Sequence, residues 1–234
     1  MPPFDAVHSL VNNWGMGIED QIPELWFNEA NKPESKILEV GFGKGSLLKR
    51  FNQAGKETEL YGLDASQTNY RHAKDQLKVK ANLSMGDISF ERFQYPDGFF
   101  DVVVMLEVLE HIMSPIHAVL EIQRVLKKDG IFIFSWPEER LISGIGKEMD
   151  QSKRQYGPGF HSFPYPGLFL YENMRIFFNQ MYFKIIEEMQ KEYHIFFKME
   201  NKKLDKPNIL DVVNGDYNGI DLYGSILTPS TISI

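Results

Sequence analysis

An acidic residue at the end of an apolar stretch is followed by a glycine-rich turn early in the chain. Residues 37–45 read ILEVGFGKG, so Glu39 precedes three glycines at alternate positions. Because glycine has no Cβ, such a turn lets a ligand come close to the main chain. Asp64 ends a second apolar stretch, where its carboxylate can accept hydrogen bonds from both hydroxyls of a ribose. Together these features predict a site for a nucleotide-type cofactor.

The spacing of the glycines distinguishes between two classes of cofactor. A dinucleotide fingerprint is G-x-G-x-x-G, but Ser46 occupies the last of these positions and the third glycine comes one residue early, at Gly45. Glu39 lies just before the turn, where it would repel a pyrophosphate. It suits better a cofactor that has no phosphate and ends in a sulfonium and an amine. An NAD-dependent oxidoreductase is therefore disfavoured.

The pattern E-x-G-x-G-x-G, with Asp64 at its spacing, resembles the first motif of the class I S-adenosylmethionine (SAM)-dependent methyltransferases. Residues 83–88 (LSMGDI) resemble the third strand of that family, whose acid usually contacts the adenine amino group. Residues 100–112 resemble the fourth strand and the segment after it, which often reads F-D-x-V-x-x-x-x-V-L-E-H. Residues 125–135 resemble the following turn and fifth strand. The resemblance covers residues 35–137 well.

The resemblance implies SAM as the cofactor, S-adenosylhomocysteine as its product, and a set of residues that bind it. Asp64 would hold the ribose and Asp87 the adenine, while Glu107 would lie near the methionine end. The expected cofactor-binding residues are Glu39, Gly41, Phe42, Gly43, Gly45, Asp64, Ala65, Asp87, Ile88, Leu106 and Glu107. Asp64 has an alternative role as a helix cap, Asp87 as a turn residue and Glu107 as a solvated loop acid. No metal site is expected, because no His, Asp or Glu cluster has a metal-ligand spacing.

Two histidines are candidates for a general base. Methyl transfer from SAM mainly needs alignment, because the sulfonium is already activated. A base helps where the acceptor must lose a proton, as a hydroxyl does. His111 follows the expected fourth strand, and His161 lies in an aromatic segment; the alternatives are a loop-holding role for His111 and a turn position for His161. No role is assigned to His8, His72, His117 and His194.

Strands and helices alternate from residue 36 onward. The strands are expected at 37–41, 59–63, 82–86, 101–106 and 130–136, and an antiparallel hairpin at 182–189 and 193–199. The helices are expected at 45–53, 66–78, 115–127 and 168–181. This alternation predicts parallel strands with helices on both faces and a ligand at the carboxyl ends of the strands. The expected fold class is α/β: a doubly wound, mostly parallel seven-stranded sheet with an antiparallel last strand, as in class I methyltransferases.

The chain of 234 residues is expected to form one methyltransferase domain with three additions. These are an N-terminal helical cap (1–34), a substrate-side insertion (138–170) and a C-terminal extension (200–234). The insertion region is rich in aromatic residues, which line an acceptor pocket or form a satellite core under a long loop. They are Trp136, Tyr156, Phe160, Phe163, Tyr165, Phe169 and Tyr171.

Composition limits the partners. The net charge of −7 argues against a nucleic-acid substrate, since phosphate binding needs a basic surface. There is no cysteine, which excludes disulfides, and neither an apolar signal core nor a membrane-length apolar run is present. We therefore expect a cytoplasmic protein, with a homodimer as one expected assembly.

The sequence-based hypothesis is methyl transfer from SAM to a small-molecule acceptor, with oxygen preferred to nitrogen and nitrogen to carbon. Two alternatives stay open at this point. One is a protein methyltransferase, whose site would be open to a peptide. The other is a non-catalytic SAM-binding or regulatory subunit.

Overall fold

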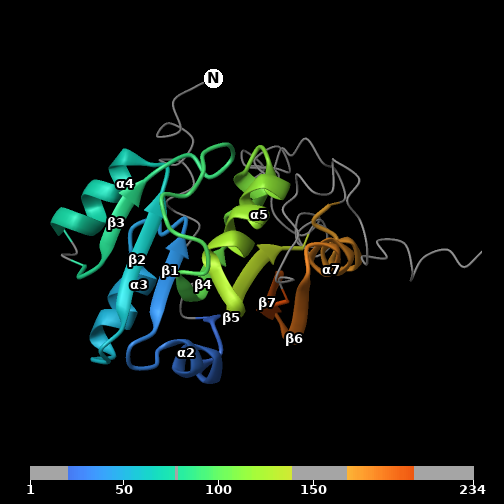
Figure 1. Cartoon of the computed structure of the whole chain (residues 1–234), viewed down its shortest axis with the longest axis horizontal. Coiled ribbons are helices and arrows are strands. Elements are labelled where there is room, and N and C mark those ends of the chain that lie inside the picture. The colour runs from blue at the N-terminus through green and yellow to red at the C-terminus, as the bar shows by residue number, and fades with distance from the viewer. Residues whose placement is uncertain (1–20, 77–78, 139–167, 203–234) are drawn as a thin grey trace, which may run out of the picture. The chain divides into compact units, whose positions relative to one another are not determined.

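The computed structural model describes residues 21–76, 79–138 and 168–202, whose strands form one seven-stranded sheet (Figure 1). The strands are β1 (Lys36–Val40), β2 (Glu59–Asp64), β3 (Asn82–Met85), β4 (Phe100–Leu106), β5 (Leu126–Pro137), β6 (Phe183–Lys191) and β7 (His194–Asn201). The helices are α2 (Glu24–Ala30), α3 (Ser46–Gln53), α4 (Gln67–Arg71), α5 (Pro115–Val125) and α7 (Tyr171–Gln180), with a π-helical turn η2 (His72–Gln76) and a 3-10 turn η3 (Leu109–His111).

Several sequence-based predictions fall partly or wholly outside these residues. The proposed cap (1–34) is described only from residue 21, and α2 is a short helix within it. Nearly all of the insertion (138–170), including His161, lies outside the described residues, as does most of the extension (200–234).

The strand order is β3-β2-β1-β4-β5-β7-β6. The five strands from β1 to β5 run parallel, whereas β7 is antiparallel to both of its neighbours, β5 and β6. The chain builds outward from β1 to β3 and then returns to add β4 on the other side, so the strand order reverses between β1 and β4. Ligands of open α/β sheets bind at such a reversal, at the carboxyl ends of the strands. This topology confirms the expected fold class.

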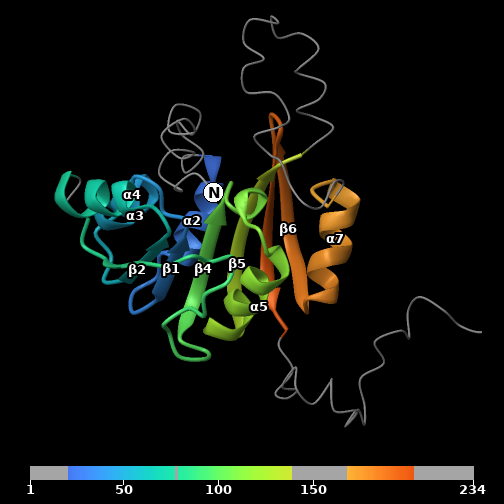
Figure 2. The same cartoon turned by 90° about the horizontal axis from the view of Figure 1, so that it is seen from above.

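Each face of the sheet is covered by its own helices (Figure 2). Successive side chains of a strand point to opposite faces. Ile37 therefore packs with the buried residues of α2 and α3, while Leu38 packs with those of α5 and α7. The first will be called the α2–α3 face and the second the α5–α7 face. Both faces of β1 are buried, and Glu39 is the charged residue among its buried side chains.

Two helix boundaries differ from the sequence-based expectation. The helix expected at 66–78 is α4 followed by the π-helical turn η2. Its cap is Ser66, whose Oγ accepts a hydrogen bond of 3.2 Å from the backbone N–H of Asn69. Gly130 follows the expected helix at a position where a left-handed cap is common, but it lies inside β5 and the residue with positive φ is Asp129, at 60°. The strand begins earlier than expected because α5 passes directly into β5.

Two of the aromatic residues expected to line a pocket belong to the core instead. Trp136 and Phe169 are buried on the α5–α7 face, and the indole Nε1–H of Trp136 donates a hydrogen bond of 2.8 Å to the carbonyl of Phe169. The Trp136 ring stacks on Phe134 with centroids 5.4 Å apart. These two residues therefore belong to the main core and not to a satellite core, whereas positions 156–165 lie outside the described part of the chain.

Candidate functional site

The glycine turn and the end of β2 are joined by hydrogen bonds. The carboxylate of Asp64 accepts one bond of 2.8 Å from the backbone N–H of Gly43 and another of 2.7 Å from that of Ser66. The N–H of Gly41 donates to the carbonyl of Leu63 at 2.7 Å. Asp64 is buried at the carboxyl end of β2, so its charge is stabilised by backbone donors. Two features read separately from the sequence thus form one structural unit.

The three glycines of the turn have positive φ but different surroundings. Gly41 (φ 73°) lies against Val108, and a Cβ there would come 2.4 Å from Val108 Cγ2. Gly45 (φ 84°) begins α3. Among the described residues, no atom lies within 4 Å of the position that a Cβ on Gly43 (φ 52°) would take. Gly41 is thus required by packing, whereas Gly43 leaves its backbone open to a ligand.

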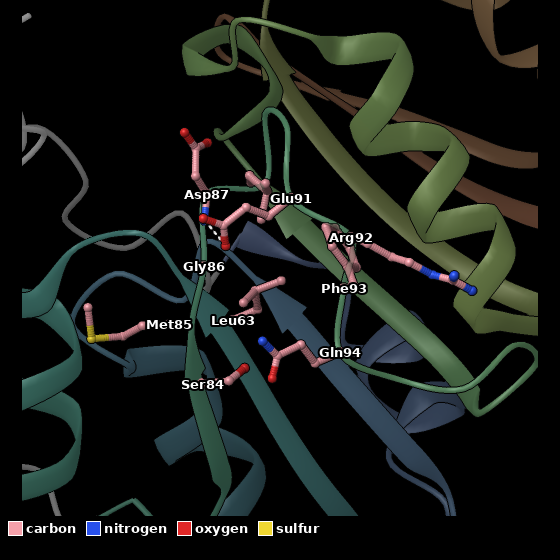
Figure 3. A pocket seen from close by; sticks show the side chains of 10 residues that line it. Leu63, Ser84, Met85, Gly86, Asp87, Glu91, Arg92, Phe93 and Gln94 are labelled. Atoms are coloured by element: carbon pink, nitrogen blue, oxygen red, sulfur yellow. Dashed lines mark hydrogen bonds between the residues drawn. The ribbon is translucent and has the colours of Figure 1, made fainter.

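Asp87 follows β3 beside a hollow at the carboxyl edge of the sheet (Figure 3). The hollow is lined by Leu63, Ser84, Met85, Gly86, Asp87, Ile88, Glu91, Arg92, Phe93 and Gln94. Asp87 Oδ1 accepts a hydrogen bond of 2.9 Å from the N–H of Ser89, and Glu91 reaches back to the N–H of Asp87. The turn role of Asp87 is therefore real, and an adenine contact stays a prediction.

Glu107, directly after β4, is held in an uncommon conformation. Its φ is 54°, a region that residues other than glycine rarely adopt. Oε1 of its carboxylate accepts a hydrogen bond of 2.8 Å from Ser135 Oγ, and Oε2 lies 3.0 Å from Nδ1 of His194. Glu107 is therefore not a solvated loop acid. Its carboxylate accepts a hydrogen bond from a side chain of β5 and lies at ion-pair distance from a histidine of β7.

Glu110 and His111 follow in the 3-10 turn η3. Glu110 is almost completely buried, and burial, with the nearby charge of Glu107 in second place, raises its pKa well above the ordinary value. His111 is half-buried, and its Nε2 lies 3.9 Å from Glu110 Oε1. Tyr193, next to His194, also has a raised pKa, first through burial and then through the charges of Glu107 and Glu192.

The structure places most of the predicted cofactor residues at one edge of the sheet. The glycine turn, Asp64 with Ala65, Asp87 with Ile88, and Leu106 with Glu107 follow the carboxyl ends of β1, β2, β3 and β4 in turn. Glu39 lies within β1, on the α2–α3 face with Ile37. Phe42, Ile88 and Leu106 are buried, so their side chains serve the core.

Ser135 and His194 are the polar residues at this edge that the sequence-based analysis missed. A usable signal was present: an antiparallel last strand begins where the parallel strands end, so its first residue lies at the ligand edge. Within the described residues, no group of three or more His, Asp or Glu side chains could hold a metal ion, and no helix is long and apolar enough to cross a membrane.

Comparison with known proteins agrees with this geometry. Residues 38–134 match a family model described as a methyltransferase domain. A malonyl-acyl-carrier protein O-methyltransferase from Geobacter sulfurreducens is 27% identical over 186 residues, which are 76% of this chain and 67% of that protein. The ubiquinone/menaquinone biosynthesis C-methyltransferase UbiE from Paraburkholderia xenovorans is 32% identical over 127 residues, 53% of this chain and 49% of its own length.

A solved structure extends the similarity to the fold. A SAM-dependent methyltransferase from Aquifex aeolicus superposes with a TM-score of 0.62 at 15% identity, covering 84% of this chain and 97% of that one. The chain spans between about a third and two thirds of the length of the first curated relatives it matches. The shared part contains the glycine turn, Asp64 and the strands that carry them. Residues 38–134 are therefore similar to a methyltransferase domain, and the fold is that of solved SAM-dependent methyltransferases.

Proposed function

We propose that this protein transfers the methyl group of SAM to a small-molecule acceptor by direct displacement at the methyl carbon. The proposal rests on the hydrogen bond between the Gly43 N–H and the Asp64 carboxylate at the carboxyl edge of the sheet. The described residues leave open space beside Gly43. An ionised carboxylate has about four acceptor positions, so Asp64 can hold the turn and bind ribose hydroxyls as well.

The remaining roles follow from the positions of the residues. Glu39 lies on the strand that leads into the turn, where a carboxylate favours the positively charged methionine end of SAM. Asp87 and Ile88 lie at the end of β3, the expected side for adenine. In the reaction, a lone pair of the acceptor attacks the methyl carbon, the carbon–sulfur bond breaks, and S-adenosylhomocysteine leaves as a neutral thioether. The protein must mainly hold donor and acceptor in line.

The acceptor atom we expect first is oxygen, then nitrogen, then carbon. The names of the relatives include an O-methyltransferase and a C-methyltransferase, which supports a small acceptor but leaves its atom open. The net charge of −7 supports an acceptor other than nucleic acid. The two alternative functions are those of a protein methyltransferase and of a non-catalytic SAM-binding subunit. The experiments below distinguish them from the proposed function.

The first experiment measures the thermal unfolding midpoint with SAM, S-adenosylhomocysteine and NAD. A ligand that binds only the folded state at about 100 times its Kd adds about 2.7 kcal/mol of stability. We expect a higher midpoint with the first two ligands only. The second experiment measures S-adenosylhomocysteine release with a panel of small hydroxyl, amine and activated-carbon compounds and with peptides. Stabilisation by SAM without release from any of them would favour the non-catalytic subunit, and release with peptides alone would favour the protein methyltransferase.

A further inference from the structure

The antiparallel strand β7 brings a histidine to the edge where the parallel strands end. His194 is the first residue of β7 and pairs with Pro137, the last residue of β5. Its Nδ1 lies 3.0 Å from Oε2 of Glu107, at the end of β4. The two residues are distant in the sequence and meet only because β7 runs against β5. The pair therefore belongs to the ligand edge of the sheet.

The pair also lies on the face that carries the cofactor residues. Phe196 packs on the α2–α3 face, and His194, two residues earlier on the same strand, points to that face as well. Ser135, two residues after Ile133, does the same and brings Glu107 with it through its hydroxyl. Glu39 lies on this face too. The pair and the start of the glycine turn therefore share one side of the sheet.

The pair is enclosed and held from several directions. The side chains of His194 and Glu107 are 11% and 18% exposed. Glu107 is fixed at positive φ by a bond of 3.2 Å from its own N–H to the carbonyl of Ser135, as well as by the Ser135 hydroxyl. Strained residues that the surroundings hold in place cluster at functional sites.

The other titratable groups around His194 come from the neighbouring elements. Tyr193, on the β6–β7 turn, has its ring 4.0 Å from the imidazole between centroids. Glu138, after β5, donates its backbone N–H to the carbonyl of Tyr193 at 2.9 Å. Glu110, in η3, is buried near Glu107. Of these groups, Glu107 is the one whose carboxylate meets the imidazole at ion-pair distance.

We propose that His194, positioned by Glu107, takes the proton that the acceptor loses during methyl transfer; this rests on the function proposed above. As the acceptor oxygen bonds to the methyl carbon and the carbon–sulfur bond breaks, the O–H proton passes to His194 Nε2. Nδ1 faces Glu107, whose carboxylate stabilises the imidazolium that forms. The acceptor class is thus a compound with a hydroxyl, or another group that must give up a proton.

The first test needs no acceptor. Isotope-labelled histidine signals are followed by NMR in the complexes with SAM and with S-adenosylhomocysteine, which differ by the sulfonium charge. The signal of His194, identified by its loss in His194→Gln, should differ in chemical shift between the two complexes, because the sulfonium charge is present only with SAM. His117, on α5 and 3.2 Å from the Glu91 carbonyl, is the control and should not respond. If SAM stabilises the protein while His194 responds no more than His117, the dyad is wrong and the proposed function stands.

The second test uses any acceptor that the panel identifies. His194→Gln should lower turnover about 10²–10⁴-fold while the Kd for SAM stays within about twofold. Glu107→Gln should lower turnover less, because the imidazole remains, and should shift the pH–rate profile. His117→Gln should leave turnover unchanged. Equal losses of SAM affinity, thermal midpoint and turnover in His194→Gln would show a structural role and overturn the proposal. Failure of the wild-type protein to bind SAM would overturn the proposed function itself.

Discussion

The backbone N–H of Gly43 donates a hydrogen bond of 2.8 Å to Oδ2 of Asp64, which joins the glycine turn to the end of the second strand. A ligand that bonds to Asp64 therefore meets a carboxylate whose orientation is already fixed. A fixed acceptor binds more tightly than a mobile one, because less conformational entropy is lost on binding. Changes in the turn and in Asp64 are consequently expected to be coupled.

Gly43→Ala should weaken SAM binding about tenfold or more, since its Cβ would enter the space left for the ligand. Its positive φ should cost about 1–2 kcal/mol of folding stability. Gly55→Ala is the matched control: Gly55 also has positive φ and open surroundings, but it lies after α3, away from the turn. It should lose similar stability and keep its SAM affinity. Calorimetry and urea unfolding measure the two effects, and equal affinities in both variants would contradict the open site at Gly43.

Gly41→Ala should behave differently from Gly43→Ala. Its Cβ would overlap the Val108 side chain, which adds about 1–3 kcal/mol to the backbone strain. The main expected effect is a lower unfolding midpoint in the absence of any ligand. If Gly41→Ala were as stable as Gly43→Ala, the packing role assigned to Gly41 would be wrong.

Asp64→Ala should weaken SAM binding by about 2–4 kcal/mol, through the loss of charge-assisted hydrogen bonds to the ribose. The variant also loses the bonds from Gly43 and Ser66, so it should be less stable by about 1–3 kcal/mol. Ser66→Ala, which removes the cap of α4, is the control and should lose stability only. Unchanged calorimetric affinity in Asp64→Ala would remove Asp64 from the site.

Glu110 should make stability fall as pH rises. Because its folded pKa lies above the ordinary value of 4.5, the folded state holds the proton more tightly than the unfolded state. The resulting stability is complete below about pH 4.5 and is lost as pH rises through the folded pKa. Glu110→Gln cannot ionise, so its stability relative to wild type should improve in urea unfolding as the pH rises above about 5.

Glu121 is the control for Glu110, because its pKa is shifted in the opposite direction, below the ordinary value. Burial raises the pKa of its carboxyl, but hydrogen bonds from Arg124 and from the Phe93 N–H outweigh burial, and the net shift is downward. Its contribution to stability is therefore present above pH 4.5 and lost as pH falls through the folded pKa. Glu121→Gln should be less stable than wild type near neutral pH and approach it in acid. A wild-type stability curve that does not depend on Glu110 above pH 5 would contradict the burial argument.

Lys198→Met should destabilise the protein by about 1–3 kcal/mol. The buried ammonium lies between Glu29 of α2 and Glu187 of β6, and its loss would leave two carboxylates facing each other. This loss of folding stability is smaller than for a fully buried ion pair, because both carboxylates are partly exposed to solvent. Lys202→Met is the control, since Lys202 also contacts two carboxylates but is exposed; its midpoint should stay close to wild type. Similar unfolding midpoints for the two variants would show that the ion pairs of Lys198 with Glu29 and Glu187 contribute little to folding stability.

The gathering of the expected cofactor residues at one edge of the sheet could be predicted from sequence because its signals are local. The glycine turn, Asp64 and Asp87 each follow an apolar strand directly, and the topology then brings the strand ends together. The pair of Glu107 and His194 could not be read in this way, since it depends on the register of an antiparallel strand. Trp136 illustrates a further limit: an aromatic residue near a site and one in the core look alike in sequence.

The boundary between α5 and β5 was predicted incorrectly for a physical reason. A glycine after a helix is usually the residue with positive φ, but here Asp129 adopts that conformation. Gly130 is needed because a Cβ would come 2.9 Å from the Lys127 carbonyl and 3.1 Å from that of Asp101. A close approach between backbones can require glycine as strictly as a left-handed turn does, and sequence alone does not separate the two.

In the proposed function, the hairpin of β6 and β7 contributes to the acceptor side of the sheet and the strands β1 to β3 contribute to the SAM side. The strands that carry the glycine turn, Asp64 and Asp87 pair among themselves and with β4, while β7 pairs with β5 and β6. If the proposal for His194 is right, an altered turn between Lys191 and His194 changes the surroundings of the acceptor without moving the strands proposed to bind SAM. Substitutions in this turn are therefore the natural way to change the preferred acceptor while the proposed SAM site stays unchanged.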